Sequence, residues 1–186
     1  MTEVVSASGA AAALRGGKVV LVPTETVVGL VAADASRLNE IKGSDPEKPI
    51  ALLCASAEEA FALAADVPPL AGQLAELLWP GPLTLVLRSR GGGTVGIRVP
   101  SGAVVDVLHA YGGPLYATSA NPTGGAAPRS LDDVERSVLS AADVVVEGEP
   151  GNGEASAVVD LTGGKPRLLR STKALSEEVL GRMSGD

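Results

Sequence analysis

Polar residues suited to anion chemistry end or follow three apolar runs between residues 80 and 125. The runs are PGPLTLVLRS, TVGIRVP and PLYATSANPTGG, and they deliver Arg98, Thr118, Ser119 and Asn121. A planar guanidinium binds a carboxylate or phosphate through paired donors, and small hydroxyl and amide groups add donors and acceptors beside flexible backbone. Short runs bounded by Gly and Pro are typical of buried strands, whose ends carry sites in α/β proteins. The segment therefore predicts one wall of an active site.

The alternative for TSANPTGG is a simple turn, because Asn, Pro and Gly favour turns. Two further segments favour a site. One is VPTETVVGL at residues 22–30, which directly follows an apolar run, and the other is EASAVVDL at residues 154–161 with PRLLR at residues 166–170. Each of them again places Thr, Ser or Arg beside a short apolar run, which is the pattern seen between residues 80 and 125.

Together with WPGPLT, the R-V-P step at Arg98 and TSAN, these segments resemble the YrdC-type threonylcarbamoyl-AMP synthase family in its short form, without the extra C-terminal domain. The family pattern is PT[DE]TVYGLG, KxR, WPGPLT, RxP, [TS]SAN and STVVD, and the resemblance covers residues 10–170. It implies an α/β fold with an open twisted mixed sheet and flanking helices around a concave cavity. It also implies a nucleotidyltransferase that joins L-threonine, bicarbonate and ATP into threonylcarbamoyl-AMP, releasing pyrophosphate, for tRNA modification.

The resemblance also implies roles for individual residues. The threonine-side contacts are Thr24, Arg98, Thr118 and Ser156, and the nucleotide-side or phosphate-side contacts are Lys42, Lys48, Thr94, Ser119, Asn121 and Arg170. Arg98 and Ser119 have the most direct part in catalysis. Because a carbamate oxygen attacks the α-phosphorus of ATP, positioning and charge neutralisation suffice without a covalent nucleophile, and Mg²⁺ is expected at the phosphates. Partners for tRNA transfer, either tRNA itself or tRNA-modification proteins, are also expected.

The chain departs from the family pattern in its first half. Val28 replaces a Tyr, Val31 replaces a Gly, and KxR becomes Lys42-Gly43-Ser44. The stretch before Lys42 is also about six residues shorter than usual, close to two helical turns, which leaves the position of Lys42 open. Loss of the arginine at Ser44 removes a charge-assisted bond worth roughly 1.5–3 kcal/mol.

Three functions remain compatible with these residues: an active synthase, a divergent paralogue with a nucleotide pocket and altered activity, and an RNA-binding or regulatory module. The net charge of −7 and the aromatic content of 2% argue against a broad nucleic-acid surface, which needs Lys, Arg and stacking rings. A small anion needs only a local basic pocket. Lys42, Lys48, Arg98 and Arg170 are the candidates for it.

Composition predicts one globular domain over residues 1–186, since 45% of residues are hydrophobic and 20% are charged. A single cysteine, Cys54, excludes an intramolecular disulfide, and with the single histidine, His109, it makes a zinc site improbable. No run of eighteen apolar residues and no basic leader segment is present. A cytoplasmic protein with no membrane segment is expected.

Hydrophobic periodicity and Gly or Pro breaks predict the elements that must position the candidate residues. Helices are expected at residues 7–15, 38–41, 57–65, 70–78, 104–111, 131–139 and 175–183. Strands are expected at residues 18–22, 50–55, 83–87, 95–99, 115–117, 143–146, 157–161 and 168–169. The PTET segment is expected to be a loop, and residues 90–93 a glycine-rich hairpin connection.

Overall fold

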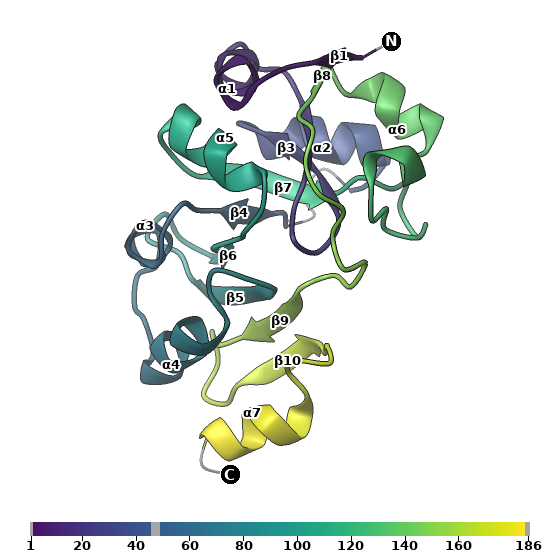
Figure 1. The fold of residues 1–186 in the computed structure, drawn as a ribbon. Coiled ribbons are helices and arrows are strands. Elements are labelled where there is room, and N and C mark those ends of the chain that lie inside the picture. Colours follow the sequence, from purple (N-terminus) through teal and green to yellow (C-terminus); the bar gives the residue numbers. More distant parts are fainter. Residues whose placement is uncertain (1, 46–48, 185–186) are drawn as a thin grey trace.

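A mixed β-sheet runs through the length of the molecule, as the computed structural model of residues 2–45 and 49–184 shows (Figure 1). Its strand order within these residues is β1-β8-β2-β3-β7-β4-β6-β5-β9-β10. The strands are β1 (Glu3–Val4), β2 (Val20–Pro23), β3 (Val28–Ala32), β4 (Ala51–Leu53), β5 (Leu83–Arg88), β6 (Thr94–Arg98), β7 (Leu115–Ser119), β8 (Val144–Val145), β9 (Ala157–Asp160) and β10 (Arg167–Arg170). The predicted α/β class with an open mixed sheet is therefore confirmed.

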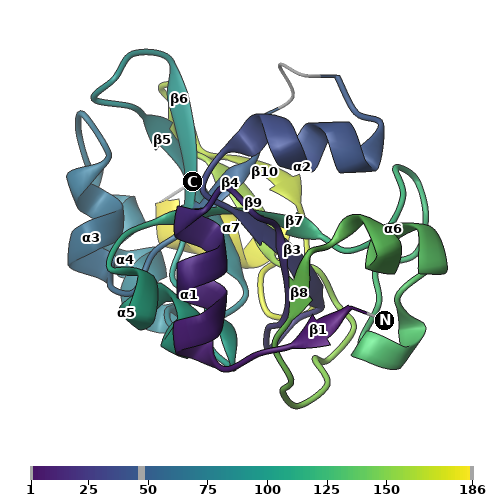
Figure 2. The ribbon, with the colours of Figure 1, turned by 90° about the horizontal axis from the view of Figure 1, so that it is seen from above.

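Helices cover both sides of this sheet. They are α1 (Ala7–Arg15), α2 (Ala35–Lys42), α3 (Ala57–Ala62), α4 (Pro69–Leu78), α5 (Val104–Tyr111), α6 (Arg136–Ala141) and α7 (Glu177–Ser184), with a 3₁₀ turn at Leu131–Asp133. In Figures 1 and 2, α1, α3, α4 and α5 lie on one side of the strands, and α2 and α6 lie on the other. The sheet is thus the frame against which each helix buries its apolar face.

The strand pairing brings the polar ends of distant segments together. β3 pairs antiparallel with β7, which sets Gly29 opposite Ser119. β4 pairs parallel with β6, which sets Leu53 beside Arg98. β5 pairs parallel with β9, which sets Leu83 beside Ala157. Because neighbouring strands lie close to 5 Å apart, their side chains share one surface.

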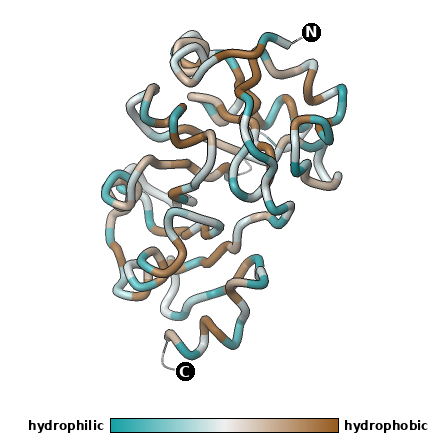
Figure 3. The backbone as a smooth tube through the Cα atoms, in the orientation of Figure 1, coloured by the Kyte–Doolittle hydropathy of each residue, from teal (hydrophilic) through white to brown (hydrophobic). Residues whose placement is uncertain are grey.

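The core is aliphatic and consists mainly of valine, leucine and alanine, with leucines as most of its largest fully buried side chains. Leu14, Leu30, Leu85 and Leu108 are all fully buried, and burying one such side chain contributes about 1.5–3 kcal/mol. In Figure 3, the apolar residues follow the strands and the hydrophilic residues gather in the connecting loops. The aromatic contribution is small, so the shape of the core depends on branched aliphatic packing.

One strand was missed and one helix was mispredicted from the sequence. The loop at PTET is present, but no strand was predicted after it, where Val28–Ala32 forms β3, fully buried between β2 and β7. A central strand that is apolar throughout shows no alternation to identify it. The helix predicted at 131–139 is split, because the chain turns extended at Val134 (φ −70°, ψ 125°) between the 3₁₀ turn and α6.

Candidate active site

A cavity of about 440 Å³ opens on the sheet, a size typical of small-molecule sites. Seven neighbouring strands contribute to its walls, from β3 at one end to β10 at the other, together with α2. Among the described residues that line it, the charged ones are Lys42, Arg98 and Arg170, and none is Asp, Glu or His. In a chain with a net charge of −7, this cavity concentrates positive charge.

Arg98 ends β6 and is buried, with 8% of its surface exposed. Its Nε donates to the Gly81 carbonyl (3.2 Å), and its Nη2 donates to Thr26 Oγ1 (3.0 Å) and to the Glu25 carboxylate (2.5 Å). A buried guanidinium needs such partners to offset its lost hydration. The predicted buried position at a strand end is confirmed, whereas the partnership with Glu25 was missed.

Arg170 lies across β9 from this group and holds Ser156. Its Nη2 donates to Ser156 Oγ (3.1 Å), and its Nε donates to the Ser156 carbonyl (2.5 Å). Ser156 Oγ also pairs with Thr84 Oγ1 at 2.9 Å. Burial, and to a lesser degree the charge of Arg98, lowers the pKa of the Arg170 guanidinium below its ordinary value. Two cations held this close favour an anion between them.

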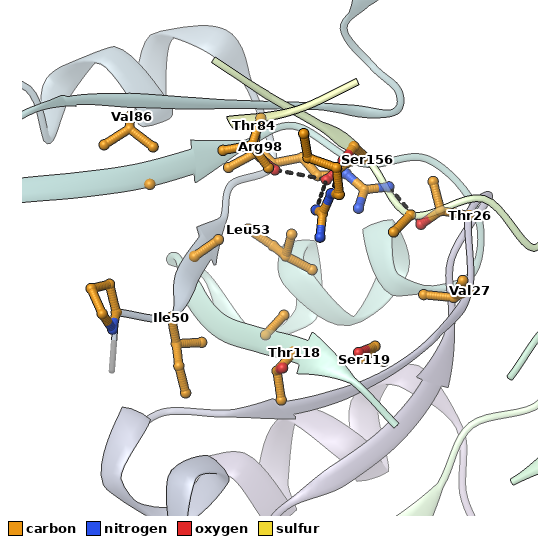
Figure 4. Close-up of a pocket in the computed structure, with 18 of the residues that line it drawn as sticks. Thr26, Val27, Ile50, Leu53, Thr84, Val86, Arg98, Thr118, Ser119 and Ser156 are labelled. Carbon is orange, nitrogen blue, oxygen red and sulfur yellow. Dashed lines mark hydrogen bonds between the residues drawn. The ribbon is translucent and has the colours of Figure 1, made fainter. Parts of the chain in front are cut away.

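Arg98, Thr26, Thr84, Ser156 and Arg170 together form what we call the guanidinium wall. Figure 4 shows Thr84, Arg98 and Ser156 on one side of the cavity, with Thr118 and Ser119 on the other. Thr26 and Thr84 were not predicted as site residues. Thr84 lies within the apolar run LTLVL, where alternation along a strand is the only signal that its side chain and that of Val86 share a face.

Thr24 lines the cavity, but its hydroxyl is used inside its own loop. Thr24 Oγ1 donates to the Val27 carbonyl (2.7 Å) and accepts from the backbone N–H groups of Thr26 and Val27 (3.2 Å each). It also lies 2.8 Å from Thr26 Oγ1. The side chain therefore closes a turn, and through Thr26 it supports Arg98.

Lys42, Ser44, Thr118 and Ser119 line the opposite side of the cavity, which we call the ammonium wall. Lys42 Nζ donates to the Ser119 carbonyl (2.8 Å) and lies 3.4 Å from Ser119 Oγ. Helix α2 ends here because Gly43 takes the left-handed conformation (φ +59°). Despite the shortened stretch before it, Lys42 thus reaches the cavity.

Ser44 faces the same cavity and is held by a neighbouring loop. Its Oγ lies 2.9 Å from Thr123 Oγ1, which also lies 2.9 Å from the Lys42 carbonyl and donates to it. Ser44, where the resemblance leads one to expect an arginine, therefore lies on the cavity surface itself. A guanidinium at this position would start from the rim of the site.

The remaining predicted residues fall in three places. Thr94 and Thr118 line the cavity, and no hydrogen bond within the described residues engages the Thr118 hydroxyl. Thr118 and Ser119 lie inside β7, whereas the sequence predicted them just past its end. Asn121 is buried but does not line the cavity, and a nucleotide-side role for it stays a prediction. Lys48 lies outside the described residues.

Asn121 closes the turn after β7. Its Nδ2 donates to the carbonyls of Pro122 (2.9 Å) and Gly125 (2.7 Å), while its buried Oδ1 has no hydrogen-bond partner in the described residues.

Val28 and Val31, the other departures from the family pattern, are fully buried and are not lining residues. Those two replacements therefore alter the core rather than the cavity surface.

The expected Mg²⁺ finds no carboxylate cluster in the described part of the chain. No group of three or more His, Cys, Asp or Glu residues there is arranged to hold a metal ion. The carboxylate of Glu25, which does not line the cavity, already pairs with Arg98. Cys54 is buried, and burial raises the pKa of its thiol to about 12, as for an inert core residue. None of the described helices is long and apolar enough to cross a bilayer.

Comparison with known proteins identifies close relatives. Residues 12–172 match the model of the Sua5, YciO and YrdC family, which is described as telomere recombination. The threonylcarbamoyl-AMP synthase of Pyrococcus abyssi is 36% identical over 91% of this chain and 55% of its own length. The threonylcarbamoyl-AMP synthase of Halorhodospira halophila is 37% identical over 78% of this chain and 84% of its own length.

A solved structure of one of these relatives has the same fold. A crystal structure of P. abyssi Sua5 complexed with L-threonine matches with a TM-score of 0.87 and 31% identity, covering 100% of this chain and 61% of that one. The chain thus spans little more than half the length of the P. abyssi protein.

Proposed function

The chain belongs to the Sua5, YciO and YrdC family, and from this membership we propose that it is a threonylcarbamoyl-AMP synthase. In the proposed reaction, the amine of L-threonine and bicarbonate form a carbamate and release water. A carbamate oxygen then attacks the α-phosphorus of ATP, the bond to the β-phosphate breaks, and pyrophosphate leaves. The threonylcarbamoyl-AMP would serve tRNA modification in the cytoplasm, in concert with tRNA or tRNA-modification proteins.

One observation carries this proposal: a cavity of substrate size collects Lys42, Arg98 and Arg170 with small hydroxyls and no acidic side chain among its described lining. The reaction brings a carboxylate, a carbamate and a triphosphate together, so positive charge facing the cavity is what it requires. These cations are spread around the cavity, with Arg98 and Arg170 on the guanidinium wall and Lys42 on the ammonium wall, so more than one anion can be held there. The proposal therefore sets the threonine carboxylate at Arg98 and the phosphates at Arg170 and Lys42.

The hydroxyls and the metal complete the proposed site. The Thr118 hydroxyl is the group we assign to the side-chain hydroxyl of L-threonine, because no other described residue engages it. Thr94 and Ser119 are assigned to the nucleotide. Since the described lining holds no carboxylate, Mg²⁺ would enter on the phosphates of ATP and supply charge neutralisation there.

The test is pyrophosphate release from ATP with and without L-threonine and bicarbonate, with the adenylate product identified by mass. Release that requires both substrates is expected. Arg170→Ala should slow it at least tenfold, whereas Arg167→Ala on the same strand should not, because Arg167 is 71% exposed and lies outside the cavity. ATP binding without threonine-dependent release would reject the proposal in favour of a divergent nucleotide-binding paralogue.

A further inference from the structure

Glu25 lies behind the guanidinium wall and reaches the cavity through Arg98. Its Oε1 accepts from Arg98 Nη2 (2.5 Å), and its Oε2 accepts from the backbone N–H of Ser101 (3.1 Å). The Glu25 side chain is 20% exposed and is not among the described lining of the cavity. Both carboxylate oxygens are therefore committed, one of them to a residue of the site.

The hydrogen bonds of Arg98 leave one arm of its guanidinium unused. A guanidinium has five N–H donors. Nε donates to Gly81, and Nη2 has two acceptors, Glu25 and Thr26. No hydrogen bond to another described residue engages Nη1, whose two N–H groups remain for a ligand in the cavity that Arg98 lines.

We infer that Glu25 is a positioning residue that fixes Nη2 of Arg98 and so presents Nη1 to the substrate anion. The inference deepens the proposed function and rests on it. A planar fork recognises an anion only in a narrow range of orientations, so an anchor on one arm defines where the other arm points. Glu25 itself would touch no substrate.

The backbone around Glu25 is held as firmly as its carboxylate. The Glu25 N–H donates to the Ser101 carbonyl (3.3 Å), and the Glu25 carbonyl accepts from Asn152 N–H (2.9 Å). Behind it, Gly151 approaches so closely that a Cβ there would lie 2.2 Å from the Thr26 carbonyl oxygen. Glu25 thus has little freedom to follow Arg98, as an anchor requires.

Because Glu25 is negatively charged, the direction in which anion affinity changes when that charge is removed tests the inference. If only net charge mattered, removing a negative charge beside Arg98 and Arg170 would strengthen anion binding. If Glu25 positions Arg98, the same removal weakens it, because the fork loses its orientation. The two mechanisms therefore predict opposite changes in affinity.

The first experiment measures binding of L-threonine, whose carboxylate the proposed function sets at Arg98, by calorimetry for Glu25→Gln. We expect binding weaker by about tenfold to a hundredfold and a matching fall in kcat. Glu178→Gln is the control, because it also removes one negative charge from an ion pair, on the surface of α7, with both partners over 70% exposed. Unchanged or tighter binding by Glu25→Gln overturns the inference.

A second experiment asks whether Glu25 acts through Arg98. Glu25→Gln should add less than a twofold loss to Arg98→Ala, since the group it positions is already gone. A loss as large as in the wild-type background overturns the inference. Glu25→Asp keeps the negative charge on a side chain that is one methylene shorter, so it should recover part of the lost affinity. It also provides a second variant for the test if Glu25→Gln fails to fold.

Restricted rotation of the Arg98 guanidinium, followed by ¹⁵N NMR of its Nη groups, gives a readout that needs no turnover. Slow exchange in the wild type and fast exchange in Glu25→Gln are expected, and equal exchange contradicts the inference. If these signals and the L-threonine affinity respond while threonine-dependent pyrophosphate release is absent from the wild type, the proposed function fails and the positioning role stands.

Discussion

The two walls of the cavity hold their cations in different ways. On the guanidinium wall, Arg98 and Arg170 are held by side chains and carbonyls from the 24–27 loop, from Ser156 just before β9 and from the segment before β5. On the ammonium wall, Lys42 contacts the Ser119 carbonyl at the end of a flexible stem. Arginine in a planar network keeps one orientation, whereas a lysine ammonium can turn among acceptors. The cavity thus has a rigid side and an adjustable side.

Under the proposed function, this difference suits Arg98 and Lys42 to different tasks. A rigid fork suits a substrate group of constant shape, such as a carboxylate. An adjustable ammonium suits phosphates, whose charge and position change as pyrophosphate leaves. The following predictions test this division, from the largest expected effect to the smallest.

The largest effect should come from the substrate side chain. A site that hydrogen-bonds a hydroxyl rejects the analogue that lacks it by about 10⁴-fold. We therefore expect pyrophosphate release with L-threonine to exceed release with L-valine by orders of magnitude, and Thr118→Val to remove most of that preference. Serine is the control, since it keeps the hydroxyl and loses a methyl group. Comparable rates with threonine and valine would contradict a hydroxyl-specific site.

Loss of a cation should cost more on the rigid wall than on the adjustable one. Arg98→Ala leaves Glu25 as an unpaired, largely buried carboxylate, and we expect threonine affinity to fall about a hundredfold. Lys42→Ala removes a donor from the Ser119 carbonyl and leaves no buried charge there, and a fall in ATP affinity of about tenfold is expected. Calorimetry with each ligand measures both. Equal losses for the two variants would remove the distinction between the walls.

The rigidity of the guanidinium wall should depend on Gly151, which packs against the 24–27 loop from outside. A methyl group there must displace the Thr26 carbonyl, so Gly151→Ala should lower the free energy of unfolding by about 1–3 kcal/mol. Urea unfolding measures this. Gly72→Ala is the matched control, because it lies in α4 with nothing within 4 Å of its added Cβ, and should raise stability by about 0.4–1 kcal/mol. Similar changes in the free energy of unfolding for Gly151→Ala and Gly72→Ala would show that the 24–27 loop moves at little cost to accommodate the added methyl group.

The smallest effect concerns the ammonium wall. Ser44→Arg restores a guanidinium at the rim beside Lys42, and we expect ATP affinity or turnover to rise up to about tenfold. Calorimetry and pyrophosphate release measure the change. Ser44→Gln is the control, since it adds length without charge. A change within about 0.5 kcal/mol, as for an ordinary surface substitution, would mean that the loop no longer serves the phosphates.

Much of the fold and the lining of the cavity followed from the sequence. Helices α1 and α5 have the bounds that apolar periodicity and flanking glycines predict, because amphipathic patterns and glycine stops are local properties of the chain. Of the ten predicted site residues, only Lys48 and Asn121 are absent from the described lining. Motif order was sufficient for this, since the motifs lie at or beside the ends of elements that border the cavity.

Only the tertiary structure decided what these residues do there. The Thr24 hydroxyl is hydrogen-bonded within its own loop, and the Asn121 amide is hydrogen-bonded within the turn after β7. In both cases the partner is a backbone carbonyl of a residue close in sequence. β3 escaped prediction because burial on both sides leaves no alternation. Glu25 meets Arg98 across 73 positions of sequence, and such a pairing depends on the register of strands far apart in the chain. The sequence alone shows which residue types occur and in what order, whereas tertiary packing decides which carboxylate pairs with which guanidinium.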